Sequence, residues 1–314
     1  MSLTTEIKDR SSPVSRFLAE RFPDHLAVVR GAKERLTAAT PILPASEVGY
    51  PWMLVGTALD FRLRFYFAPT RVRDLLTVQI GMDKLYQNRP DLVPLDEGRA
   101  IMRDLVPALD GIVKETRPAG RRLDRPDEER LCRYCAGLAL FDDFGRSPRV
   151  PDRLVSPRIV ASADDLLALA DPAWVDDLCA LSWAFYDQCG DLLSSASVLN
   201  PQFRGSRDVN GADADLILDG CLIEIKTTKA PVLTRFMLEQ AIGYALLDYE
   251  DEYWIREVGV YMARQGVFLR WPLDALLATM GGGPVPDLGR VRDEFRQAAA
   301  TSGYSYDPNA LPTR

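Results

Sequence analysis

Three charged residues lie on two neighbouring short apolar segments, where they could act together in hydrolysis. Asp215 opens the first segment, and Glu224 and Lys226 lie two residues apart on the second. The dipeptide Asp219-Gly220 between the segments is typical of a two-residue β-hairpin turn. Because side chains alternate along a strand, Glu224 and Lys226 share one face, and the hairpin brings Asp215 beside Glu224. We therefore expect two carboxylates and one ammonium group in a small volume.

Two neighbouring carboxylates repel each other unless a cation lies between them, and hard oxygen ligands of this kind suit Mg²⁺. The simpler interpretation is that Glu224 and Lys226 are solvated surface charges of little energetic consequence. The residues that follow Lys226 in the sequence favour a functional site over surface charges. A helical segment at about 234–249 carries Gln240 and Tyr244 four residues apart, and therefore on the same side. An amphipathic helix with a polar edge would show the same spacing.

Taken in order along the chain, these residues resemble the motifs of a nuclease superfamily. Asp215, Glu224-Ile225-Lys226 and Gln240-Ala241-Ile242-Gly243-Tyr244 are similar to the motifs of the PD-(D/E)xK nucleases, in particular the RecB-type branch. In that branch, an acidic residue, Asp/Glu-x-Lys and Gln-x-x-x-Tyr lie on a strand–strand–helix run. The resemblance implies that this region forms the nuclease core.

The same branch often has an earlier helix with the motif Gly-Thr-x-x-His. Gly56-Thr57-Ala58-Leu59-Asp60 is similar to that motif, with Asp60 in place of the histidine. Aspartate also binds Mg²⁺, so Asp60 is a further candidate ligand. Many relatives carry cysteines for an iron–sulfur cluster after the Gln-x-x-x-Tyr helix. No cysteine follows Cys221 in this chain, and we expect no iron–sulfur cluster.

The resemblance implies hydrolysis of phosphodiester bonds in DNA, with Mg²⁺ or Mn²⁺ as the cofactor. Asp215 and Glu224 would hold the metal ion, and the backbone carbonyl of Ile225 would complete its shell. Asp60 and Asp213 are further candidate ligands. Asp213 would share a face with Asp215 in the first strand, although a polar residue beside a turn is an equally good interpretation.

The resemblance also implies roles for the remaining motif residues. Lys226 would stabilise charge that develops in the transition state. We expect it to face solvent, so Lys226→Ala should abolish cleavage and leave the fold intact. Gln240 and Tyr244 would hold a phosphate or orient Lys226 through hydrogen bonds. Three basic residues near the motifs are candidate nucleic-acid contacts, namely Arg204, Arg207 and Lys229.

Two other functions are compatible with the same residues. A degenerate nuclease core would bind nucleic acid or a partner protein without cutting, although the presence of Asp215, Glu224 and Lys226 argues against degeneration. A helical scaffold with an incidental hairpin would need three motifs in register by chance.

The substrate is left open by the sequence: DNA or RNA, single strand or duplex, and cleavage at an end or in the interior. So are the pathway (repair, recombination or defence against foreign DNA) and a helicase or other protein partner.

Bulk composition excludes several classes of protein. The 314 residues carry a formal charge of −7, which is unlike a passive nucleic-acid coat. The single histidine, His25, argues against a Ser-His-Asp triad. The five cysteines and the lack of a signal-peptide core indicate reduced thiols in the cytoplasm. Cys132 and Cys135 fall in a helical pattern, which favours buried thiols over a zinc site. No apolar run approaches the roughly 20 residues of a membrane span.

The periodicity along the chain indicates a large helical region followed by a small α/β core that carries the motifs. We predict an α/β (α+β) fold with a restriction-endonuclease-like mixed sheet core. Residues 1–150 are predicted to form a helical region, with the upstream site helix at 52–67, and the loop at 147–158 marks the boundary. The nuclease core is predicted at 151–275, and a helix and tail at 276–314. Within the core we expect strands at about 198–226 and 257–270, around the helix at 234–249. The individual strands are predicted at 198–203, 213–218, 221–226, 257–262 and 266–270.

Overall fold

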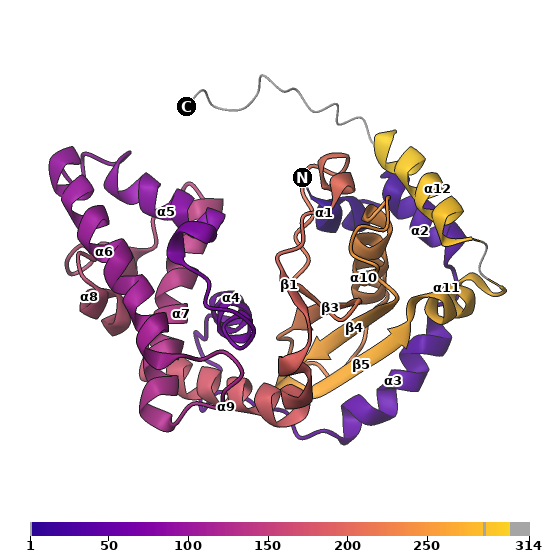
Figure 1. Cartoon of the computed structure of the whole chain (residues 1–314), viewed down its shortest axis with the longest axis horizontal. Coiled ribbons are helices and arrows are strands. Elements are labelled where there is room, and N and C mark those ends of the chain that lie inside the picture. Colours follow the sequence, from indigo (N-terminus) through magenta and orange to yellow (C-terminus); the bar gives the residue numbers. More distant parts are fainter. Residues whose placement is uncertain (1, 285–286, 302–314) are drawn as a thin grey trace. The chain divides into compact units, whose positions relative to one another are not determined.

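The computed structural model describes residues 2–284 and 287–301 and divides the chain into two compact units. The first, which we call the sheet unit, comprises residues 1–41 and 195–314, and the second, the helical unit, comprises residues 42–194. A five-stranded mixed sheet and a majority of helical residues make the chain an α+β protein, as predicted (Figure 1).

The sheet has five strands in the order of the sequence. Strands β3 and β4 run parallel and every other neighbouring pair is antiparallel. Helix α10 (Arg235–Leu247) connects β3 to β4 and packs against both strands (Figure 1). The strands are β1 (Ser197–Leu199), β2 (Leu216–Leu218), β3 (Cys221–Lys226), β4 (Glu257–Met262) and β5 (Val267–Pro272).

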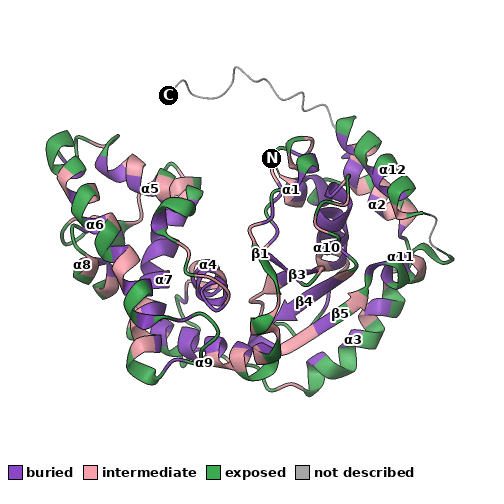
Figure 2. Cartoon of the chain, in the orientation of Figure 1, coloured by how far each residue is buried: buried purple, intermediate pink, exposed green. Residues whose placement is uncertain are grey.

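One face of the sheet carries the main hydrophobic core. The strand register puts Leu222 beside Val258, and Val260 beside Leu269, and all four side chains are buried in one cluster with α10. Figure 2 shows α10 buried along most of its length. Further helices contribute to the same cluster, namely α1 (Leu3–Lys8), α2 (Pro13–Arg21), α3 (Leu26–Ala38), α11 (Leu273–Gly281) and α12 (Leu288–Ala300).

The N-terminal helices belong to the sheet unit, which differs from the predicted helical region at 1–150. Leu3 on α1 and Leu18 on α2 are completely buried in the core of the sheet unit. Ser12 accepts a hydrogen bond from the backbone of Val14 and, with Pro13, begins α2. An amphipathic pattern shows that a helix has a buried face, but it does not identify the partner that covers that face.

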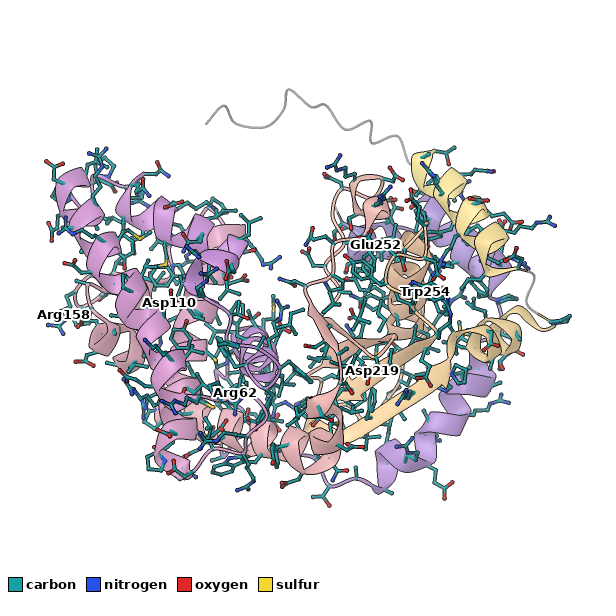
Figure 3. The ribbon with its side chains drawn as sticks, in the orientation of Figure 1. Arg62, Asp110, Arg158, Asp219, Glu252 and Trp254 are labelled. Atoms are coloured by element: carbon teal, nitrogen blue, oxygen red, sulfur yellow. The ribbon has the colours of Figure 1, made fainter. Side chains whose placement is uncertain are left out.

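The helical unit spans residues 42–194, and the predicted domain boundary at 147–158 therefore falls inside this unit. The guanidinium of Arg62 (labelled in Figure 3) forms a completely buried ion pair with Glu128 at 2.7 Å. The central carbon of the Arg62 guanidinium lies 3.9 Å from the centre of the Tyr66 ring. Cys132 and Cys135 are buried free thiols on α7, as predicted. The helices are α4 (Trp52–Arg64), α5 (Leu76–Tyr86), α6 (Leu95–Thr116), α7 (Arg125–Arg146), α8 (Ala163–Ala168) and α9 (Pro172–Cys189).

Several boundaries differ from those predicted. Strand β1 ends at Leu199 rather than at residue 203, because Pro201 cannot donate to a strand ladder. Strand β2 begins at Leu216, so Asp213 lies before the strand. Helix α4 ends at Arg64 rather than at residue 67. Among the described helices, none combines the length and the apolar character that crossing a membrane requires.

Candidate functional site

The β2–β3 hairpin forms around the predicted turn. Leu218 pairs with Cys221, which leaves Asp219 and Gly220 as the two turn residues. Their φ angles are 45° and 77°, and positive φ at both positions is the signature of a type I′ turn. A Cβ atom at Gly220 would also lie 2.8 Å from the carbonyl oxygen of Trp254. The turn therefore fixes the register that aligns the two strands.

This register brings Asp215 opposite Glu224. Leu216 pairs with Ile223, so the next pair outward joins Asp215 to Glu224 at the open end of the hairpin. The Asp215 carboxylate accepts a hydrogen bond from the backbone nitrogen of Ile225, with an Oδ2–N distance of 2.7 Å. Glu224 lies two residues beyond Leu222 and so on the helix-covered face of the sheet. The two carboxylates therefore lie on the same side, as predicted.

The ammonium group of Lys226 joins the strand to helix α10. Its Nζ lies 2.6 Å from Oε2 of Glu224 and 2.9 Å from Oε1 of Gln240. The Lys226 side chain is only 18% exposed and that of Glu224 only 3%. The prediction that Lys226 faces solvent is thus wrong, because α10 covers this face of the sheet and encloses most of its side chain.

Gln240 and Tyr244 lie on the buried side of α10. Thr234 begins this helix by accepting a hydrogen bond from the backbone of Met237. Nε2 of Gln240 donates to the Tyr244 hydroxyl at 3.1 Å. Because Oε1 of the same amide accepts from Lys226, Gln240 connects the tyrosine to the lysine. The structure thus brings together the five residues of the three core motifs, Asp215, Glu224, Lys226, Gln240 and Tyr244.

The electrostatics of the site favour a charged lysine. Burial by itself would lower the pKa of Lys226, but the charges of Glu224 and Asp215 outweigh it and raise the pKa above its ordinary value of 10.5. Burial, together with the same two carboxylates, raises the pKa of the Tyr244 hydroxyl. Lys226 is therefore an ammonium group at neutral pH, and it supplies the positive charge that lets the carboxylates lie close together.

The donor set fits a divalent ion only in part. Among the described residues, no group of three or more His, Cys, Asp and Glu side chains is arranged to hold a metal. Mg²⁺, however, commonly uses one or two carboxylates and completes its shell with water and substrate phosphate. Asp215 and Glu224 share one side of the hairpin, next to the backbone of Ile225. This set matches that pattern, and it requires further oxygen ligands from solvent or substrate.

The structure places the other candidate residues outside strands β2 and β3 and helix α10. Asp213 is exposed and precedes β2. Asp60 lies on α4 of the helical unit, where its carboxylate forms an ion pair with Arg64 at 2.6 Å. Arg204 forms an ion pair with Glu250 at 2.7 Å. Arg207 and Lys229 are exposed residues of the sheet unit.

One hydrogen bond of the site involves a residue that the sequence did not indicate. The hydroxyl of Thr4, on α1, accepts a hydrogen bond from Nε2 of Gln240 at 3.4 Å. Residues 4 and 240 are 236 positions apart in the sequence, and α1 was not predicted. The polar residues Ser2 and Glu6 around Leu3 are the only local sign that a helix begins there.

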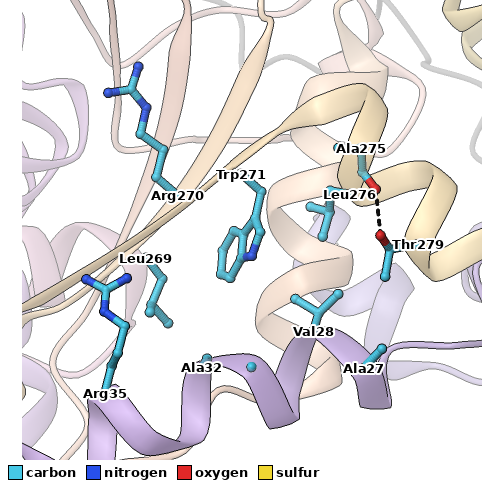
Figure 4. Close-up of a pocket in the computed structure, with 11 residues that line it drawn as sticks. Ala27, Val28, Ala32, Arg35, Leu269, Arg270, Trp271, Ala275, Leu276 and Thr279 are labelled. Atoms are coloured by element: carbon cyan, nitrogen blue, oxygen red, sulfur yellow. Dashed lines mark hydrogen bonds between the residues drawn. The ribbon is translucent and has the colours of Figure 1, made fainter.

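A separate groove of about 340 Å³ lies between α3, β5 and α11 (Figure 4). Small residues, including Gly31 and Ala275, leave the space open, and Trp271 forms part of its wall. Arg35, which also lines the groove, donates to the backbone oxygen of Phe268 at 3.0 Å. The groove is mainly apolar and shares no residue with the carboxylate cluster.

Comparison with protein-family models, with curated protein sequences and with solved structures finds no match for this chain. The geometry of the cluster of Asp215, Glu224, Lys226, Gln240 and Tyr244 is therefore the basis for inferring function.

Proposed function

We propose that this chain is a metal-dependent nuclease that hydrolyses phosphodiester bonds in DNA, with a core of the PD-(D/E)xK type. One observation carries the proposal. Asp215, Glu224 and Lys226 converge at one end of the β2–β3 hairpin, and Gln240 of the following helix bonds to the lysine. The strand–strand–helix order of these elements supports the resemblance, and with it a restriction-endonuclease-like core.

Each residue of the cluster has a chemical role in this reaction. A divalent ion held by Asp215, Glu224 and the carbonyl of Ile225 would supply Lewis-acid polarisation of the scissile phosphate and acidify a water molecule. Lys226 has three donor hydrogens. The described residues account for two of them, through Glu224 and Gln240, which leaves one for a phosphate oxygen. That donor would stabilise negative charge as it develops on the phosphate.

Partial burial makes this donor more effective. Charge–charge interactions strengthen where water is excluded, and the Lys226 side chain is mostly enclosed, with 18% of its surface exposed. The raised pKa keeps the ammonium group protonated at working pH. Gln240 and Tyr244 hold the lysine in one orientation, so little reorganisation is needed when substrate binds.

The test is cleavage of DNA by the full chain in Mg²⁺ or Mn²⁺ and in EDTA, over single-stranded and duplex substrates. We expect cleavage only with the metal ion, and we expect Lys226→Met to lower the cleavage rate by at least a hundredfold, as loss of one transition-state donor does elsewhere. Methionine keeps the apolar stem of the lysine. Lys33→Met, at an exposed position on α3, is the matched control and should retain the wild-type rate.

Two results would contradict the proposal. One is cleavage that continues in EDTA, and the other is a Lys226→Met variant that cuts DNA at the wild-type rate. DNA binding that is the same with and without Lys226, in the absence of any cleavage, would instead support a catalytically silent binding module. Titration calorimetry with Mn²⁺ on the wild type and on Asp215→Asn would test the metal ion separately from the reaction.

A further inference from the structure

We propose that Thr4 is a positioning residue of the carboxylate–lysine site, acting on Lys226 through the amide of Gln240. This inference rests on the proposed nuclease function. It assigns to the N-terminal helix α1 a part in the site that the nuclease motifs do not include.

The orientation of the Gln240 amide depends on its partners. The oxygen and nitrogen ends of an amide have nearly the same shape, so hydrogen bonds decide which end points where. Lys226 only donates, and it therefore selects the oxygen end. The nitrogen end donates to the hydroxyls of Tyr244 and Thr4, at 3.1 Å and 3.4 Å. Thr4 thus gives the second amide hydrogen an acceptor in a largely buried location.

Helix α1 is held beside this amide by contacts with the loop before Asp215 and with helix α10. The backbone nitrogen of Leu3 donates to the carbonyl of Gly211 at 2.9 Å, in the loop that leads to Asp215. The buried Leu3 side chain packs against Gly243 of α10, where an added Cβ atom would lie 3.2 Å from it. Gly243 lies between Gln240 and Tyr244 in the sequence, so the motif helix itself provides the space that lets α1 approach.

Removing the Thr4 hydroxyl should affect the rate more than substrate binding. Without the Thr4 hydroxyl, the Gln240 amide nitrogen loses one hydrogen-bond acceptor. Lys226 is then held less firmly in the orientation that stabilises the transition state. A hydrogen bond of this kind corresponds to about a threefold to tenfold change in rate. Because Thr4 acts through Gln240 on a transition-state contact, we expect kcat to fall while KM stays close to the wild-type value.

The experiment compares three variants of the full chain. Thr4→Val removes the hydroxyl and keeps the shape, Thr4→Ser keeps the hydroxyl, and Thr5→Val is a neighbouring exposed control. We expect Thr4→Val alone to lower kcat, and Thr4→Ser to restore it. Equal rates for Thr4→Val and the wild type would overturn the proposal. So would equal losses in Thr4→Val and Thr4→Ser, because that result would indicate a purely structural role.

A second measurement needs neither metal nor substrate. The side-chain amide of Gln240 gives a pair of proton–nitrogen NMR signals, assigned through their loss in Gln240→Met. We expect Thr4→Val to shift these signals and speed their hydrogen exchange, and Thr5→Val to leave them unchanged. Unchanged signals in Thr4→Val would contradict the positioning role. If the wild type cuts no DNA, the nuclease proposal fails, and these signals still decide whether Thr4 orients Gln240.

Discussion

At the scale of single residues, the central finding is that the site contains its own counter-ion. Glu224 is nearly completely buried, and its carboxylate lies 2.6 Å from the ammonium of Lys226. A buried carboxylate without a cation would be costly, and its pKa would rise until it became neutral. Lys226 thus places a positive charge beside this buried carboxylate before any metal ion binds. This changes the expectation for Lys226→Ala, because the lysine also stabilises the fold.

The pH dependence of stability should reveal this ion pair. The pKa of Lys226 in the folded chain is raised above 10.5, so its contribution to stability is fully present below that pH and is lost as the pH rises through the raised value. We expect the unfolding free energy of the wild type to exceed that of Lys226→Met at neutral pH, and the difference to shrink above pH 10.5. Urea unfolding of both proteins from neutral pH to above pH 10.5 measures this difference in unfolding free energy.

The control for this measurement is Lys33→Met, whose difference from the wild type should change little over the same range. A difference between the wild type and Lys226→Met that stays constant into alkaline pH would show that the charge of Lys226 does not stabilise the fold.

At the scale of helices and strands, local sequence patterns predicted the elements that carry the five residues of the proposed site. Strands β3 and β4 have the predicted bounds, and the Asp219-Gly220 turn follows from local chemistry alone. The five motif residues lie within 30 positions, so strand alternation and helical spacing could place them together. The burial of Lys226 and the contact with Thr4 depend instead on which distant helices cover the sheet, and that information is not local.

Close helix crossings are a second feature that periodicity does not reveal. Helices α5 and α7 approach so closely that a Cβ atom at Gly81 would lie 2.0 Å from the carbonyl oxygen of Phe141. We expect Gly81→Ala to destabilise the chain by about 1–3 kcal/mol or more, because the two backbones must separate. Thermal and urea unfolding would measure the loss.

Gly111 in α6 provides the matched control, because an added Cβ atom there meets nothing within 4 Å. Gly111→Ala should stabilise the chain by about 0.5–1 kcal/mol, as expected for alanine in place of glycine inside a helix. If Gly81→Ala behaved like Gly111→Ala, the close crossing of α5 and α7 would be refuted.

At the scale of the whole molecule, the sheet unit is built from both ends of the sequence. The helical unit, residues 42–194, interrupts it. The sequence suggested a boundary near residue 150 because the composition changes there, in a stretch rich in proline and arginine. That stretch is instead a connection inside the helical unit. Which helices share a core depends on packing between segments that are far apart in the sequence.

This organisation predicts how fragments of the chain behave. A fragment of residues 195–314 lacks α1, α2 and α3, and with them the buried side chains of Leu3, Leu18 and Leu36. Their loss would expose a large apolar surface on α10 and the sheet. We therefore expect this fragment alone to show no cooperative unfolding by circular dichroism, whereas a fragment of residues 42–194 should unfold cooperatively.

Adding a peptide of residues 1–41 to the 195–314 fragment should restore cooperative unfolding, because the peptide supplies the missing part of the core. The same peptide with Leu18→Asp should fail, since a buried carboxylate at this completely buried position would be unpaired. Cooperative unfolding of the 195–314 fragment without the peptide would show that the first 41 residues are dispensable for the core.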